Sequence, residues 1–292
     1  MLQDESRQRP RRSLLYMPAS NPRAMRKARE LPCDGVILDL EDSVGAEGKP
    51  AARVAAIAAA RTGFGGREVT IRCNGLDTEW AAADLEAAAA AGPDAVLAPK
   101  VSSPAEVHAY DTRLSGAPAR TRLWIMVETA RAVAGIESIA ETAGGTRLAG
   151  LVIGPNDLAL DLRLRSGHAR AALRPILVRV AAAARAHGLL IFGGVFNALD
   201  DEAGLKAECD EEAGYGLDGK TLIHPRQVEI ANAAFSPSPE EIAWARAVVG
   251  AFAAPEAVGK GAIRLDGRMI ERLHLQAAER MLAVARSLSS RP

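Results

Sequence analysis

Short runs of apolar residues alternate with longer helical patterns along most of the chain. Each run is rich in Val, Ile and Leu with few polar residues, which is typical of strands buried on both faces of a sheet. The eight candidate strands are Ser13–Ala19, Gly35–Glu41, Glu68–Asn74, Ala95–Val101, Arg122–Thr129, Leu148–Gly154, Leu189–Phe196 and Lys220–Ile223. Helix start signals lie between them, such as Asn21 before Pro22 and Ser103 before Pro104.

Eight strand–helix units in a row predict an α/β fold, a closed parallel TIM (β/α)8 barrel over residues 12–235. A doubly wound sheet is the alternative, but no G-x-G-x-x-G turn follows the first strand.

The pattern changes after Phe235. A helix is predicted from Pro239 towards Ala253, a hairpin around Asp266-Gly267, and a final helix over roughly His274 to Ser287. We expect residues 236–292 to form a C-terminal helical and hairpin arm, because so short a segment rarely builds a core of its own. Such an arm packs on its own barrel or reaches another subunit.

Composition and charge narrow the function classes. The chain has 292 residues, with 36 Lys+Arg and 36 Asp+Glu, so its formal net charge is zero and nucleic acid is not an expected partner. No apolar stretch reaches about 18 residues, so we expect no membrane span. Residues 1–11 are basic and predict a disordered, solvated tail. The three scattered cysteines form no disulfide or zinc pattern, which favours a cytoplasmic protein.

Polar residues follow the candidate strands at their carboxyl ends, where TIM barrels carry their chemistry. They include Glu41, Arg72, Lys100, Glu128 and the pair Asn156-Asp157. Acidic residues beside buried strands are costly unless they are paired or bind a metal. We therefore expect several carboxylates, one arginine and one lysine to point into one cavity at the carboxyl ends of the strands.

Glu128 and Asp157 follow adjacent strands and are candidate Mg²⁺ ligands, since Mg²⁺ prefers oxygen donors and keeps several waters. The alternative for Asp157 is a helix N-cap. Arg72 suits a substrate carboxylate, or it forms a structural ion pair with Glu41 or Asp42, and the two roles are compatible. Lys100 either contacts substrate or balances the acidic cluster.

These residues lie in segments that together resemble one family. The segments are Arg12 to Pro18, Leu38 to Val44, Arg72 to Gly75, Pro99 to Val101, Val127 to Ala130, Gly154 to Leu158, Gly219 to Pro225 and Asp266 to Ile270. In the order and spacing of these segments, the chain resembles the citrate lyase β-subunit-like (CitE-like) branch of the HpcH/HpaI aldolase superfamily. The resemblance extends from about residue 12 to residue 285.

The resemblance implies a TIM barrel with a C-terminal arm that covers a neighbouring subunit's active site in a homotrimer or hexamer. It implies a carbon–carbon lyase that uses Mg²⁺, or Mn²⁺, on a CoA thioester such as citryl-, malyl- or citramalyl-CoA, giving acetyl-CoA and a 2-keto acid. By motif position the resemblance implies metal binding for Glu128 and Asp157, and for Arg72 a catalytic role in gripping the keto acid and stabilising developing negative charge. The candidate substrate contacts are Arg72, Glu41, Lys100 and Asn156. The region around Lys27, Lys49 and Arg53 is the candidate for binding the CoA phosphates.

The chain departs from the family near its end. Members commonly read Ile-Asp-x-Pro, whereas this chain reads Ile270-Glu271-Arg272-Leu273. Glu271 keeps a carboxylate and is the candidate catalytic acid or base; the alternative is a solvated residue in the first turn of the last helix. The change leaves open a malyl-CoA-type thioesterase, besides an aldolase acting on free 2-keto acids and a low-activity subunit of a citrate lyase complex.

Overall fold

The structure, a computed structural model, describes residues 9–165 and 169–289. The chain divides into two compact units, one covering Arg11–Ala233 and one that includes the chain from Ala234 onward. Residues 1–8 of the predicted disordered tail lie outside the described residues. Arg11, at the end of that segment, is buried, with its Nε 2.5 Å from Oε2 of Glu68, and so belongs to the first unit.

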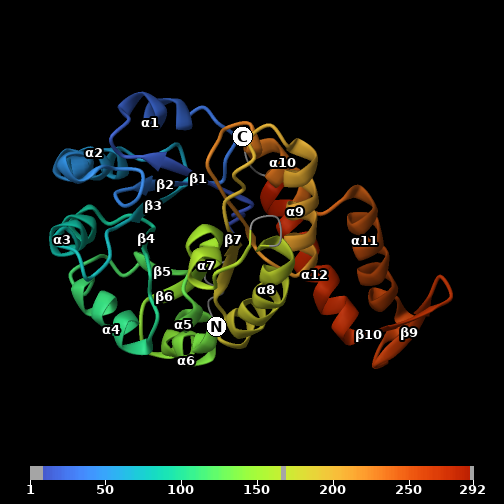
Figure 1. The fold of residues 1–292 in the computed structure, drawn as a ribbon. Coiled ribbons are helices and arrows are strands. Elements are labelled where there is room, and N and C mark those ends of the chain that lie inside the picture. Colours follow the sequence, from blue (N-terminus) through green and yellow to red (C-terminus); the bar gives the residue numbers. More distant parts are fainter. Residues whose placement is uncertain (1–8, 166–168, 290–292) are drawn as a thin grey trace. The chain divides into compact units, whose positions relative to one another are not determined.

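Eight parallel strands close into a barrel in chain order, with β1 paired to both β2 and β8 (Figure 1). They are β1 Ser13–Pro18, β2 Gly35–Asp39, β3 Glu68–Arg72, β4 Ala95–Ala98, β5 Arg122–Val127, β6 Leu148–Ile153, β7 Leu190–Gly193 and β8 Gly219–Leu222. The prediction of a TIM barrel is confirmed. All eight predicted strands ran past the observed carboxyl ends, because the residues after each ladder belong to the loops.

Helices connect the strands and surround the barrel. They are α1 Pro22–Ala28, α2 Lys49–Thr62, α3 Ala81–Ala91, α4 Pro104–Arg113, α5 Ala130–Ala134, α6 Ile136–Glu141, α7 Pro155–Asp161, α8 Ala169–Ala186, α9 Glu202–Gly214 and α10 Gln227–Ala234. The predicted caps form, since the side chains of Asn21 and Ser103 accept hydrogen bonds from the first turns of α1 and α4. Within residues 9–165 and 169–289, no helix is long and apolar enough to cross a membrane.

Apolar side chains from six of the eight strands fill the barrel interior. The cluster consists of Leu14, Ile37, Ala95, Leu97, Trp124, Met126, Val152 and Phe192. The rings of Trp124 and Phe192 lie 4.8 Å apart between centroids. A Cβ on Gly150 would lie 2.8 Å from Trp124, so the absence of a side chain there leaves space for the indole.

On β2 and β5 the interior face leads directly to polar residues at the carboxyl end of the strand. Residues two apart on a strand share a face. Asp39 therefore follows Ile37 on the inner face of β2, and Glu128 continues the inner face that Trp124 and Met126 occupy on β5. Packing of the apolar interior thus fixes the direction in which these carboxylates point.

After α10, the described part of the C-terminal unit contains two α-helices, a hairpin and the short 3-10 helix Pro255–Ala257. Its elements are α11 Pro239–Ala253, β9 Ala262–Leu265, β10 Arg268–Glu271 and α12 Arg272–Ser289. Ser238 and Glu241 form a capping box at the start of α11. Asp266 and Gly267 both have positive φ, at 47° and 79°, as a tight hairpin turn requires. A small apolar core holds the unit together, formed by Ala245, Val248, Ile270 and Ala278.

Candidate active site

A cavity of about 410 Å³ lies at the carboxyl ends of the barrel strands. We call it the barrel cavity. Its lining comes from seven of the eight strands or the loops that follow them, and consists of Tyr16, Pro18, Asp39, Asp42, Ser43, Arg72, Met126, Glu128, Ile153, Gly154, Pro155, Asn156, Asp157, Val195, Asn197, Thr221 and Ile223. Arg72, Glu128, Asn156 and Asp157, all predicted from strand ends, meet here.

Arg72 is the centre of an ion-pair cluster. Its Nε and Nη2 donate to the two carboxylate oxygens of Asp39, at 2.6 and 2.8 Å. Its Nη1 lies 2.8 Å from Oε2 of Glu41 and 3.5 Å from Oδ2 of Asp42. The guanidinium also lies over the ring of Tyr16, 4.9 Å from the centroid. The predicted ion pairs with Glu41 and Asp42 are therefore present. Arg72 also forms a bidentate ion pair with Asp39.

The pKa values of the two carboxylates nearest Arg72 are shifted in opposite directions. Burial raises the pKa of Asp39, but hydrogen bonds from Arg72 outweigh it, so the pKa lies below its ordinary value. For Glu41, burial dominates over the attraction of Arg72 and raises the pKa to about 8. Among the described residues, Oε2 of Glu41 has no hydrogen-bond partner, because the short contact to Arg72 is poorly aligned.

Glu128 is almost completely buried, at 2% exposure, beneath the loop after β4. Its Oε1 accepts a hydrogen bond of 2.7 Å from the backbone N–H of Lys100. Lys100 has a φ of 54°, a left-handed conformation that is uncommon outside glycine and that orients this donor. Burial, with some repulsion from Asp157, raises the pKa of Glu128 to about 7 despite the hydrogen bond.

Asp157 and Asn156 lie in the first turn of α7, at the mouth of the barrel cavity. The N-cap of α7 is Gly154, so Asp157 does not occupy the N-cap position. Its side chain is 40% exposed and lies 3.8 Å from Nζ of Lys100. Lys100 therefore balances part of the acidic charge. Asn156 accepts a hydrogen bond of 2.7 Å from the side chain of Asn197.

The charges around the barrel cavity fit a divalent cation with oxygen ligands. The acidic groups are Asp39, Glu41, Asp42, Glu128 and Asp157, and the basic groups beside them are Arg72 and Lys100. Burial is the main cause of the raised pKa values of Glu41 and Glu128, and the neighbouring carboxylates add to it. Within the described residues, no group of three or more His, Cys, Asp or Glu side chains could hold a metal. Mg²⁺ does not need such a group, because one or two carboxylates with water and substrate oxygens suffice.

The three basic residues expected to bind CoA phosphates have different surroundings. Lys27 is exposed on α1, so its predicted role stays a prediction. Lys49 is buried, and its ammonium donates to three protein oxygens, which leaves no donor for a phosphate. The Nε of Arg53 donates to Asp84 at 2.6 Å. The predicted phosphate role does not fit the surroundings of Lys49, and Arg53 is already held by a buried carboxylate.

Glu271 belongs to the C-terminal unit, where it is half-buried at the end of β10. Its backbone N–H donates to Nδ1 of His274 at 3.0 Å, which ties the strand to the first turn of α12. Its catalytic role stays a prediction.

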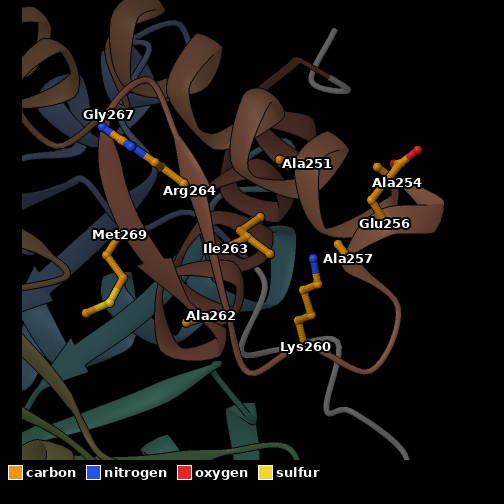
Figure 2. A pocket seen from close by; sticks show the side chains of 10 residues that line it. All are labelled: Ala251, Ala254, Glu256, Ala257, Lys260, Ala262, Ile263, Arg264, Gly267 and Met269. Atoms are coloured by element: carbon orange, nitrogen blue, oxygen red, sulfur yellow. The ribbon is translucent and has the colours of Figure 1, made fainter.

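The same unit contains a hollow of about 700 Å³ between the end of α11 and the hairpin (Figure 2). It is lined mainly by Ala, Ile and Met side chains. Glu256 is its one lining carboxylate, so it lacks the acidic character of the barrel cavity.

Sequence reasoning gave no role to several residues that line the barrel cavity, among them Asp39, Tyr16 and Asn197. For Asp39 and Tyr16 a signal exists, because each lies two residues after an apolar residue of its strand and so shares the inner face. Asn197 lies in a loop, where no periodicity indicates direction.

Fold and site together define a class: a TIM-barrel protein with an acidic, arginine-containing site at the carboxyl ends of its strands. Comparison with known proteins gives the family. Residues 12–225 match the family model of HpcH/HpaI aldolase/citrate lyase. The chain belongs to this family, and its predicted likeness to the CitE-like branch is confirmed.

Three similar proteins illustrate the range of the family. The (3S)-malyl-CoA thioesterase of Cereibacter sphaeroides is 46% identical over 282 residues, which are 96% of each chain. The citrate lyase subunit beta of Leuconostoc mesenteroides subsp. cremoris is 31% identical, over 95% of this chain and 94% of the relative. The crystal structure of CitE from Mycobacterium tuberculosis in complex with magnesium, acetoacetate and coenzyme A has a TM-score of 0.76 and 31% identity, covering 94% of this chain and 97% of that one.

Proposed function

We propose that this protein is a Mg²⁺-dependent enzyme that hydrolyses the CoA thioester of a small 3-hydroxy dicarboxylic acid, of the malyl-CoA type. The observation that carries the proposal is the buried carboxylate of Glu128 in a cavity that Asp157 and Arg72 also line. Such a cavity suits an anionic, oxygen-rich substrate bound together with a cation. The choice of hydrolysis rests on the relative at 46% identity, which is named as a malyl-CoA thioesterase.

Glu128 and Asp157 would hold the Mg²⁺, or Mn²⁺, with water and substrate oxygens completing its coordination. When bound, the ion supplies positive charge that polarises a substrate oxygen. Lys100 would hold Glu128 through its backbone N–H and offset the charge of Asp157 through its ammonium.

In the proposed hydrolysis, a water oxygen attacks the thioester carbonyl carbon while a carboxylate base takes one proton from the water. The C–S bond then breaks, the free acid forms, and the CoA thiolate leaves and gains a proton. Arg72 provides fixed positive charge beside the developing negative charge. Glu271 is the proposed base, supplied by the C-terminal arm of a neighbouring subunit in a trimer or hexamer. Glu41, Lys100 and Asn156 are proposed substrate contacts, and Lys27 is a proposed CoA phosphate contact.

A second candidate is C–C bond cleavage, which is favoured by the likeness to a citrate lyase subunit and to a structure holding acetoacetate and coenzyme A. Here the base takes the proton of the 3-hydroxyl group, the C–C bond breaks, and a 2-keto acid leaves. The acetyl-CoA enolate that remains then gains a proton. The same residues would serve both reactions.

The test is a panel of malyl-, citryl- and citramalyl-CoA, each with Mg²⁺, with Mn²⁺ and with a chelator. Hydrolysis releases a free thiol and no keto acid, whereas C–C cleavage releases a keto acid and no thiol. We expect metal-dependent thiol release, fastest with malyl-CoA. Release of a keto acid without free thiol would show that the protein catalyses C–C cleavage and not hydrolysis. Turnover of free 2-keto acids alone would indicate an aldolase, and inactivity of the pure protein would favour a subunit of a larger complex.

A further inference from the structure

A buried polar network lies behind the barrel cavity, between the carboxyl ends of β2 and β3. The ammonium of Lys49 donates to the carbonyl oxygens of Leu40 and Glu41, at 2.9 and 3.0 Å, and to Oδ1 of Asn74, at 2.6 Å. These three bonds use every donor of the lysine. The ring of Trp80 covers the ammonium, with its centroid 4.9 Å away.

Further hydrogen bonds, on the side away from the barrel cavity, hold Asn74, whose side chain accepts from Lys49. The amide nitrogen of Asn74 donates to the carbonyl oxygen of Leu40 and to Oδ2 of Asp84, at 3.0 and 2.5 Å. The other oxygen of Asp84 accepts from Nε of Arg53 at 2.6 Å. Lys49 and Arg53 are four residues apart on α2 and so share one helix face, which is turned towards this network.

The position of Lys49 bears on the site through the backbone of Glu41. The N–H of Glu41 donates to Oδ1 of Asp39 at 2.9 Å, and its carbonyl accepts from Lys49. Both sides of this residue are therefore held, and its side chain lies 2.8 Å from Nη1 of Arg72. Without the ammonium, each of the two carbonyls would lose one of its two donors, since Leu40 keeps Nδ2 of Asn74 and Glu41 keeps the backbone N–H of Val44. Oδ1 of Asn74 would lose its ammonium donor as well, so the turn that carries Glu41 would be held by fewer hydrogen bonds.

We propose that Lys49 is a positioning residue, which holds the turn at the end of β2 so that Glu41 stays against Arg72, which lines the barrel cavity. It therefore does not bind the phosphates of CoA. The role rests on the proposed function, since it supports the reaction of the same site. Lys49 acts on the site through the backbone of Leu40 and Glu41 and through the side chain of Asn74.

The kinetic test compares Lys49→Met with Lys206→Met, which removes an exposed lysine of α9 that pairs with Asp210. Each variant is assayed with malyl thioesters of CoA and of pantetheine, which carries no phosphate. We expect Lys49→Met to lower kcat about 100-fold with both esters and to keep KM within about threefold of the wild-type value. The reason is that misplacing groups of the active site lowers the rate of the reaction more than it weakens substrate binding. Lys206→Met should match the wild type.

A rise in KM that is confined to the CoA ester, with kcat unchanged, would show a phosphate contact and overturn the proposal. Wild-type kinetics in Lys49→Met would overturn it as well. If Lys49→Met does not fold, Asn74→Ala takes its place, because it removes one acceptor of Lys49 and one donor to Leu40. We expect that variant to lower kcat about tenfold with both esters, and an unchanged kcat would overturn the proposal.

Amide hydrogen exchange tests the positioning without any substrate. We expect residues 40–44 to exchange faster in Lys49→Met, or in Asn74→Ala, than in the wild type and in Lys206→Met. Unchanged exchange would overturn the positioning role. Inactivity of the wild type towards every ester would instead remove the proposed function, so the two failures are distinguishable.

Discussion

Gly154 leaves space for Glu128. A Cβ at position 154 would lie 2.5 Å from both Cβ and Oε2 of Glu128, and 3.2 Å from Cε of Met126. The end of β6 therefore packs directly against the buried carboxylate at the end of β5. This close approach explains why a glycine precedes the first turn of α7, and it couples the backbone of one strand end to the acidic group of another.

Gly154→Ala should displace Glu128. Overpacking of this kind costs about 1–3 kcal/mol of stability, and a shift of about 1 Å in a catalytic group costs about 100-fold in rate. We expect both losses, measured by thermal unfolding and by turnover. Gly144→Ala is the matched control, because a Cβ there meets no atom within 4 Å. Equal activity in the two variants would contradict the placement of Glu128 in the reaction.

Asp157→Asn should abolish metal-dependent turnover and leave the fold intact. The side chain is 40% exposed, so its loss disturbs little packing. A metal contributes several kcal/mol of transition-state stabilisation, so we expect a fall in rate of about 100-fold or more. Titration calorimetry should show weaker Mg²⁺ binding. Asp210→Asn on α9 is the control, and full activity of Asp157→Asn at saturating substrate would remove the metal assignment.

The stability of the metal-free protein should depend on pH through Glu41 and Glu128. Burial raises their pKa values to about 8 and about 7. Groups with raised pKa values stabilise the fold fully below their unfolded pKa of about 4.3, and this stabilisation is lost as the pH rises through the folded values.

The melting temperature in chelator should therefore fall between about pH 5 and about pH 8.5, by roughly 2–4 °C for each kcal/mol lost. Added Mg²⁺ should raise it more at the higher pH, because the ion binds the ionised carboxylates. A metal-free protein whose stability stays level over this range, or whose response to Mg²⁺ is larger at low pH, would contradict the account. Glu128→Gln should flatten the dependence.

Glu271→Gln should lower kcat about 10²- to 10⁴-fold, the usual effect of losing a general base. Glu279→Gln, an exposed residue of α12, is the control and should keep full activity. If Glu271 acts in a neighbouring subunit's cavity, co-folded mixtures of Glu271→Gln and Asp157→Asn chains should regain activity, since mixed oligomers would contain intact sites. Mixtures as inactive as their components would argue that both residues serve within one chain.

Periodicity was sufficient to predict the barrel, because buried parallel strands give continuous apolar runs that local sequence displays. The strand-end rule then located Arg72, Glu128 and Asp157 in one cavity. Lys49 shows where this reasoning fails. Its neighbours Gly48 and Pro50 indicate a helix start, but the acceptors that bury its ammonium lie 8 to 25 residues away in sequence. No local pattern distinguishes such a lysine from an exposed one.

The raised pKa of Glu41 could not be predicted from the sequence either. A carboxylate that follows a strand and lies near an arginine is expected to be ionised, because the arginine stabilises its negative charge. In the structure Arg72 already holds Asp39 with two hydrogen bonds, so burial dominates at Glu41 and its pKa rises. Competition of this kind depends on which carboxylate aligns with the guanidinium, and only the three-dimensional arrangement decides that.

The most direct test of the central claim is product analysis of malyl-CoA turnover in ¹⁸O-labelled water with Mg²⁺. Hydrolysis predicts free CoA and malate with one ¹⁸O atom in the carboxylate released from the thioester, no glyoxylate at any time, and no reaction in chelator. Glyoxylate and acetyl-CoA forming in step, without free thiol and without ¹⁸O-labelled malate, would contradict thioester hydrolysis.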